Sequence, residues 1–339
     1  MKNKIHLTGR NLLTLDDLTD AELLYLLDLS ASLKRKKQRH FRGKLLLQKN
    51  IALVFEKAST RTRTACIVAA VDEGGAAEYL EVHDTHFGKK ESVKDSARVL
   101  GRVFDGIMFR GFKHSTVEIL AQYAGVPVWN GLTDDDHPTQ ALADLMTIRE
   151  RFGTLKGLKV VYAGDGRNNV ALSLMTACAK TGINFVDCTP PSLNPPEDRV
   201  ARARESAERN ESTITVTADP REAVIGANVI YTDVWVSMGE EAMFAERVKL
   251  LRPYQVNREL MAQTGNIDNG RVIFLHCLPA FHNNETVVTK DIGALEVTDE
   301  IFEAPYSKVF DLAENRMHTI KALMVATLTG KGKRHVTKG

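Results

Sequence analysis

The feature that most constrains the fold of this chain is a repeated alternation of short apolar runs with segments of helical periodicity. An apolar run of about five residues suits a buried strand, whereas an amphipathic helix needs a longer pattern. Longer patterns of that kind, such as Ser59–Val71 and Gln140–Phe152, separate the runs. Strands separated by helices are typical of βαβ units, whose parallel sheets are buried on both faces. The sequence therefore predicts an α/β fold. The expected strands are Ile51–Phe55, Gly106–Phe109, Val126–Trp129, Lys159–Ala163, Asn184–Asp187, Val229–Asp233 and Val272–Leu275.

Length and one polar break predict two domains. The chain has 339 residues, and a domain commonly takes roughly 100–200 residues. The segment Arg151–Gly157 (RFGTLKG) is polar and contains glycine, so we expect a boundary there.

Composition excludes several classes of protein. Lys and Arg together number 45 and Asp and Glu 43, for a formal charge of +2, so we expect neither nucleic acid nor a membrane as a partner. The longest apolar run, Ala65–Val71, is far shorter than the ~20 residues of a membrane span. The four cysteines show no CxxC spacing, which argues against a disulfide framework or a structural zinc site. No apolar secretion signal precedes the first acidic residues, and a cytoplasmic location is expected.

The residues after the first expected strand suggest an anion site. Ligands of open α/β sheets bind at the carboxyl ends of the strands. Ile51–Phe55 leads into a hydroxyl-rich turn, and a helix begins at Ser59, where free backbone N–H groups meet. Arg61 could add a bidentate, charge-assisted contact. The alternative is an ordinary serine cap with surface arginines. The turn lacks the glycines and the lysine of a P-loop.

Two further strand ends carry candidate residues. Arg110 follows Gly106–Phe109, where a surface salt bridge is the alternative. His137 and Gln140 follow the strand Val126–Trp129, just before the expected helix Gln140–Phe152. A lone histidine there is more often a capped, satisfied side chain. The run Asp134–Asp136 lacks the alternating spacing of a calcium loop and reads as a solvated turn.

The second half of the chain offers groups suited to an amino compound. The turn Gly164–Asn169 (GDGRNN) resembles a dinucleotide-binding turn but has asparagine at the third glycine position. Asp233 is a carboxylate at a strand end, followed by a flexible loop. Cys277, with His276 and His282 nearby, is either a nucleophile or a buried structural thiol. Anion-binding groups in one half and these groups in the other point to group transfer from an acyl phosphate to an amine.

Several motifs, in order along nearly the whole chain, resemble those of the transcarbamylases. They are Ser59–Arg63 (STRTR), Phe109–Gly111 (FRG), His137–Gln140 (HPTQ), Asp233–Gly239 (DVWVSMG), His276–Pro279 (HCLP) and Ala313–Thr319 (AENRMHT). The Asp233–Gly239 segment resembles the loop of the ornithine-specific members. Transfer of a carbamoyl group from carbamoyl phosphate to the δ-amine of L-ornithine is the implied reaction. It serves arginine biosynthesis in one direction and arginine deiminase-type catabolism in the other.

The resemblance also implies an architecture. It has two domains, each a central parallel sheet flanked by helices. Residues 1–150 would bind carbamoyl phosphate, with a C-terminal helix at about 317–335 completing that domain, and residues 151–316 would bind ornithine. The family forms homotrimers whose sites are shared, because a loop from the neighbouring subunit, here His83–Ser92, completes the phosphate site. Members usually have glutamine at the position of His86, and the Asp134–Asp136 run is more acidic than usual.

The family's functional residues carry over to matching positions. The implied catalytic residues are Arg110, His137, Asp233 and Cys277. The implied carbamoyl phosphate ligands are Ser59, Thr60, Arg61, Thr62, His86, Arg110, His137, Pro138, Thr139, Gln140, Cys277, Leu278 and Arg316. The implied ornithine ligands are Asn169, Asp233, Ser237 and Met238. Neither a metal nor a cofactor is expected.

Three other functions stay open at this point. The acceptor could be putrescine or aspartate, although Asp233 would repel the second carboxylate of aspartate. A dinucleotide-dependent dehydrogenase could use the Gly164–Asn169 turn. A non-catalytic binding protein is the third, but it should have lost one of Arg61, Arg110 or His137, and all are present.

Overall fold

The computed structural model describes residues 5–82, 86–236 and 241–329, and it contains two compact units. The first takes in Met1–Met146 with Glu314–Gly339, and the second Thr147–Ala313. The expected boundary after residue 150 falls inside helix α5 (Pro138–Phe152), which carries the chain from one unit to the other. The expected C-terminal helix begins earlier than supposed, since α12 covers Val309–Leu328.

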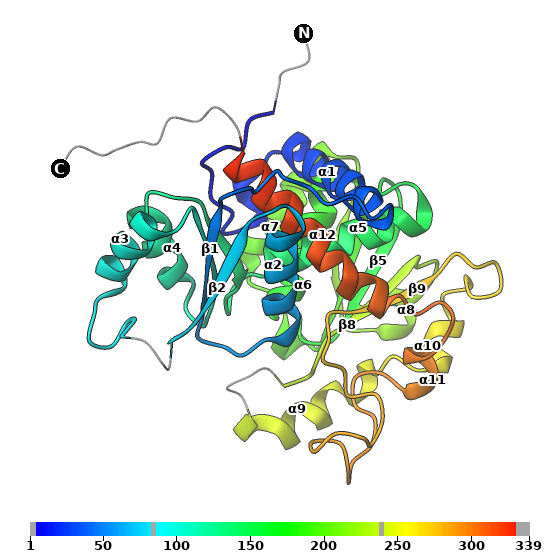
Figure 1. Ribbon diagram of the computed structural model, residues 1–339. Helices are drawn as coiled ribbons and strands as arrows, with labels where there is room; N and C mark the ends of the chain where they lie inside the picture. Colours follow the sequence, from blue (N-terminus) through cyan, green and yellow to red (C-terminus); the bar gives the residue numbers. More distant parts are fainter. Residues whose placement is uncertain (1–4, 83–85, 237–240, 330–339) are drawn as a thin grey trace. The chain divides into compact units, whose positions relative to one another are not determined.

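The first unit is built on a four-stranded parallel sheet (Figure 1). Its strands are β1 (Asn50–Phe55), β2 (Ala76–Glu81), β3 (Gly106–Arg110) and β4 (Val128–Leu132), in the order β2-β1-β3-β4. Its other helices are α1 (Asp20–Gln38), α2 (Thr60–Asp72), α3 (Val93–Val103) and α4 (His114–Tyr123), preceded by the 3₁₀ turn η1 (Leu15–Asp17). The chain crosses from one side of β1 to the other between β2 and β3. The carboxyl ends of β1 and β3 therefore form a topological switch point, where α/β sheets bind ligands.

The second unit repeats this plan with a five-stranded parallel sheet. Its strands, in the order β7-β6-β5-β8-β9, are β5 (Lys159–Ala163), β6 (Asn184–Cys188), β7 (Ile214–Thr217), β8 (Val229–Thr232) and β9 (Ile273–His276). Its helices are α6 (Asn169–Thr181), α7 (Glu197–Arg209), α8 (Pro220–Val224), α9 (Phe244–Leu251), α10 (Arg258–Ala262) and α11 (Asp299–Phe302), with 3₁₀ turns η3 (Pro191–Leu193), η4 (Glu241–Met243) and η5 (Arg252–Tyr254). Here the switch point lies between β5 and β8.

The central strands of both sheets are buried apart from the first residues of β1, β5 and β6, as parallel sheets require. In the first unit, Val54 and Phe109 pack with Val117 and Leu120 of α4 in one apolar cluster. The indole of Trp129 on β4 donates a hydrogen bond to Thr327 Oγ1 at 3.1 Å, which ties α12 to this sheet. This contact helps to place the segment after residue 313 in the first unit. Within the described ranges, no helix combines the length and apolarity needed to cross a membrane.

The predicted α/β fold with parallel sheets is confirmed, and the differences lie at the sheet edges. Strands β2 and β7 were not predicted because each is an edge strand with several half-exposed or exposed positions, so neither forms an apolar run. The strand expected at Val126–Trp129 begins at Val128 instead. Pro127 lacks the N–H that a ladder residue donates, which explains the later start.

Candidate functional site

The hydroxyl-rich turn after β1 forms the start of α2. Ser59 has extended backbone angles, and its Oγ accepts a hydrogen bond from the backbone N–H of Thr62 at 3.2 Å. This cap fixes the first turn of α2, where backbone N–H groups and the helix dipole favour an anion. Thr60 and Arg61 stand in the same turn. The predicted residues Ser59 to Thr62 therefore lie at the switch point of the first sheet.

Arg316, far away in the sequence, joins this turn to the start of α5. Its Nη2 donates to Thr62 Oγ1 at 3.1 Å, and its Nη1 donates to Gln140 Oε1 at 2.6 Å. The same guanidinium lies 3.5 Å from Thr139 Oγ1 and 3.5 Å from His137 Nε2. Its side chain is buried, as are its four partners. The fold thus brings together five residues predicted to bind carbamoyl phosphate.

His137 is held neutral by its surroundings. Burial lowers the pKa of His137 well below its usual value, and the charges of Arg316, Arg110 and Arg61 lower that pKa further. Arg110 at the end of β3 is also buried. Three guanidinium groups therefore lie close enough to act on this one imidazole. Such a site suits a ligand with about two negative charges.

In the second unit, β8 and β9 end beside each other and place Asp233 against Cys277. The Cys277 Sγ donates a hydrogen bond to Asp233 Oδ1 at 3.0 Å. Asp233 is buried, and its Oδ1 also accepts from the Val234 N–H at 2.8 Å. Cys277 is partly exposed, whereas the other three cysteines are buried. A carboxylate and an accessible thiol in contact form a polar pair suited to a cationic or amine group.

A buried His–Glu pair supports the turn that contains Cys277. Leu278 has a positive φ of 61°, a strained conformation for this residue type, and its N–H donates to His276 Nδ1 at 2.9 Å. His276 Nδ1 is thus an acceptor, so Nε2 carries the proton and donates to Glu296 Oε1 at 3.2 Å. The Phe281 N–H donates to the same oxygen at 2.6 Å. Glu296 therefore holds both ends of the Cys277 turn.

The turn after β5 presents Asn169 as the first residue of α6. Gly166 lies so close to the core that an added Cβ would sit 2.7 Å from Asp187 Oδ2 and 3.0 Å from Leu193 O. Asp165 forms an ion pair with the buried Arg247 at 2.8 Å. The turn is thus packed on side chains at the positions where a dinucleotide fold would receive a pyrophosphate. This packing disfavours the dehydrogenase alternative.

Comparison with known proteins identifies the family. The model of the aspartate/ornithine carbamoyltransferase carbamoyl-P binding domain matches residues 10–150, and that of the Asp/Orn binding domain matches residues 156–327. The chain belongs to the aspartate/ornithine carbamoyltransferase family. The transcarbamylase resemblance seen in the motifs is thereby confirmed.

Relatives and solved structures of this family cover almost the full chain. A catabolic ornithine carbamoyltransferase of Bacillus licheniformis is 56% identical, covering 97% of this chain and 99% of that protein. One from Streptococcus ratti is also 56% identical, covering 94% and 96%. The structure of ornithine carbamoyltransferase from Pyrococcus furiosus matches with a TM-score of 0.88 and 43% identity, covering 96% and 99%. The anabolic enzyme of Campylobacter jejuni matches with a TM-score of 0.83 and 34% identity, covering 93% and 97%.

Three residues implied by the transcarbamylase motifs lie in or beside segments outside the described residues. Ser237 and Met238 lie outside the described residues. His86 is described and exposed, and its carbonyl accepts hydrogen bonds from the N–H groups of Lys89 and Glu91. Residues 83–85 of the same loop lie outside the described part of the chain.

Among the residues that the structure describes, two groups of side chains have the composition of metal ligands. Asp233, His276 and Cys277 offer ligand atoms within 4.8 Å of one another. Both ring nitrogens of His276 are already engaged in hydrogen bonds, so this group reads as part of the turn's support. His282, Asp299 and Glu303 form the second group, in which His282 Nδ1 already bonds to Asp299 Oδ1 at 2.6 Å.

Sequence reasoning about this carbamoyltransferase missed Glu296. Glu296 belongs to none of the motifs named above. Its role in supporting the Cys277 turn is visible only from its buried carboxylate and the two hydrogen bonds that it accepts. A glutamate flanked by Leu295 and Val297 was a weak signal of burial, since both neighbours are apolar.

Proposed function

We propose that this protein transfers the carbamoyl group of carbamoyl phosphate to the δ-amine of L-ornithine, giving L-citrulline and phosphate. The observation that carries the proposal is the convergence of Arg316, Arg110 and Arg61 on a buried, neutral His137 beside the start of α2. We assign the phosphate group of carbamoyl phosphate to the first unit and ornithine to the second. The family-model descriptions and the strand-end residues of each unit support this division.

Phosphate recognition would fall to Ser59, Thr60, Arg61 and Thr62. Hydroxyl groups and first-turn amides donate hydrogen bonds to phosphate oxygens, and the helix dipole adds a favourable field. Arg61 neutralises charge both in the bound substrate and on the leaving phosphate. The same group therefore serves binding and departure of the leaving group.

The carbamoyl end would meet His137, Arg110 and Gln140, with main-chain groups of Pro138 and Thr139 nearby. Attack on the carbonyl carbon moves negative charge onto the carbonyl oxygen. A neutral imidazole N–H and a guanidinium stabilise that oxyanion as the charge develops. Collapse of the tetrahedral species then breaks the C–O bond to phosphate.

The amine must lose a proton before it attacks, because an ammonium group has no free electron pair. Its pKa in water is near the lysine value of ~10.4. Asp233 and Cys277 are assigned to accept or relay that proton, and Leu278 to bind the carbamoyl group through its main chain. Asn169, Ser237 and Met238 are assigned to the rest of ornithine.

We further propose a cytoplasmic homotrimer in which His86 of one subunit reaches the phosphate site of the next. Exposed apolar side chains on the first unit support an assembly through that unit. Among them are Leu45, Leu47, Val68 and Val71. The four cysteines are all free thiols, which is consistent with a reducing compartment.

A citrulline-formation assay tests the function. Purified protein with carbamoyl phosphate should form citrulline from ornithine, and putrescine and aspartate should be poor acceptors at equal concentration. Arg61→Ala should keep the fold and lose turnover by about a hundredfold or more. Equal rates with putrescine, or a loss below tenfold in the variant, would contradict the assignment.

A further inference from the structure

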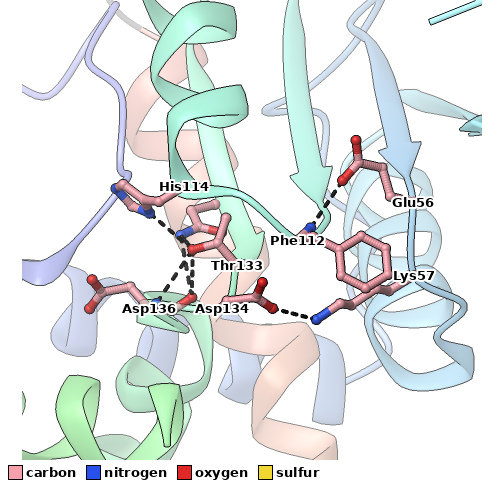
Figure 2. Close-up of polar contacts among 8 residues, drawn as sticks. Glu56, Lys57, Phe112, His114, Thr133, Asp134 and Asp136 are labelled. Atoms are coloured by element: carbon pink, nitrogen blue, oxygen red, sulfur yellow. Dashed lines mark hydrogen bonds and ion pairs between the residues drawn. The ribbon is translucent and has the colours of Figure 1, made fainter. Parts of the chain in front are cut away.

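The carboxyl ends of β1, β3 and β4 are cross-linked by one cluster of polar contacts around Phe112 (Figure 2). The Phe112 N–H donates to Glu56 Oε2 at 3.0 Å, and the Phe112 carbonyl accepts from the Asp134 N–H at 2.8 Å. Lys57 Nζ pairs with Asp134 Oδ1 at 2.6 Å and lies 4.3 Å from the centroid of the Phe112 ring. Side chain and main chain therefore connect three loops that are distant in sequence.

The two members of the Lys57–Asp134 ion pair differ in burial. The Lys57 side chain is 6% exposed, whereas that of Asp134 is 56% exposed. A buried ammonium without a counter-charge is costly, while an exposed carboxylate is well hydrated alone. Among the described residues, the one carboxylate paired with Lys57 is that of Asp134. The Lys57 ammonium therefore depends on Asp134 for its counter-charge, whereas water can solvate the Asp134 carboxylate without Lys57.

Each loop of the cluster carries a residue assigned to carbamoyl phosphate. Lys57 stands two residues before Ser59, Phe112 two residues after Arg110, and Asp134 three residues before His137. An extended chain spans at most about 3.6 Å per residue. Because only two or three residues separate the cluster from these groups, a movement of the cluster also moves them. Glu56 and Phe112 approach closely because Gly111, between Arg110 and Phe112, has no Cβ to obstruct Glu56 Oε2.

We propose that Lys57, Phe112 and Asp134 form a clamp that sets the spacing of the Ser59 turn, Arg110 and His137 for carbamoyl phosphate. Lys57 is a positioning residue that acts through Asp134 and Phe112. The proposal rests on the proposed function, since it takes carbamoyl phosphate as the ligand of these groups. A misplacement of about 1 Å at such a site can cost a hundredfold in rate, so a clamp of this kind controls activity without touching substrate.

The test compares Lys57→Met, Asp134→Asn and the double variant with a matched control. The control is Lys49→Met, which removes a lysine–aspartate pair (2.8 Å to Asp105) from the opposite end of the same strand. Steady-state assays give the KM for carbamoyl phosphate and for ornithine, and calorimetry gives the affinity for inorganic phosphate. Thermal unfolding reports the fold of each variant.

If the clamp positions the phosphate site, its loss should change the KM for carbamoyl phosphate but not the KM for ornithine. Lys57→Met should raise the KM for carbamoyl phosphate and weaken phosphate binding by about tenfold or more, with the KM for ornithine within twofold of wild type. Simple loss of folded protein lowers the apparent kcat and leaves KM unchanged. The double variant should be no worse than Asp134→Asn, because both changes break one connection. Lys49→Met should behave as wild type.

Phosphate affinity and the KM for carbamoyl phosphate decide whether the clamp proposal is wrong. A folded Lys57→Met protein whose phosphate affinity and KM for carbamoyl phosphate both stay within twofold of wild type refutes it. If Lys57→Met does not fold, Lys57→Arg and Asp134→Asn decide by the same criterion. If wild type forms no citrulline, the proposed function fails, while the phosphate titrations still judge the clamp.

Discussion

Asp187 should make the stability of the second unit depend on pH, and Asp187→Asn should remove that dependence. The carboxyl group lies at the end of β6 and is buried, and its Oδ1 has no hydrogen-bond partner among the described residues. Burial, and then the neighbouring Asp165 carboxylate, raise the pKa of Asp187 to about 8 from the 3.8 of an unperturbed aspartate. The folded protein therefore prefers the protonated form of Asp187.

The magnitude follows from linkage between protonation and folding. Below pH 3.8 both the folded and the unfolded chain hold the proton, and Asp187 costs nothing. As the pH rises toward 8, the unfolded chain releases the proton and the folded chain keeps it, so stability falls by about 1.4 kcal/mol per pH unit. At pH 7 the accumulated cost is roughly 4 kcal/mol, a large share of a typical folding free energy. Above pH 8 the cost levels off.

Urea unfolding at pH 6, 7 and 8 measures this slope. Trp235 is buried in the second unit and reports its unfolding by fluorescence, while Trp129→Phe in both proteins removes the signal from the first unit. The free energy of unfolding of the Asp187 parent should fall by about 2–3 kcal/mol across this range relative to Asp187→Asn. Asp198→Asn, on the exposed start of α7, should leave the slope unchanged. Parallel pH profiles for the parent and Asp187→Asn would refute the reasoning.

Three further changes test the site. Arg316→Lys loses the planar fork that reaches Thr62 and Gln140. In a variant that still unfolds cooperatively, kcat/KM for carbamoyl phosphate should fall about a hundredfold, and a loss below tenfold contradicts this. Glu296→Gln removes the carboxylate that orients the Cys277 turn, so kcat should fall about tenfold. The inhibition constant of inorganic phosphate should not change, and a changed value would place the effect at the phosphate site instead. Iodoacetamide should alkylate Cys277 before the other three cysteines, because their thiols are buried. Peptide mass mapping identifies the modified residue, and early modification of another cysteine would contradict this burial pattern.

The sequence by itself determined the class of fold and the local character of the strand ends. Runs such as Ile51–Phe55 and Lys159–Ala163 predict buried parallel strands because both of their faces must be apolar. Motifs such as Ser59–Arg63 and His137–Gln140 are readable because each is a short run of neighbouring residues at the start of a helix. Local chemistry of this kind needs no knowledge of distant segments.

Only the tertiary structure decided which distant residues meet and which strands lie at the edges. Strands β2 and β7 escape prediction because each is an edge strand with partly exposed residues, so neither forms an apolar run. The bond from Arg316 to Thr62 spans 254 residues, and the pair of Lys57 and Asp134 spans 77. Such pairings depend on the order of strands in the sheet, which hydrophobic patterning does not encode. The physical reason is that burial acts on each segment's own surface, whereas a polar contact needs two segments brought to hydrogen-bond distance.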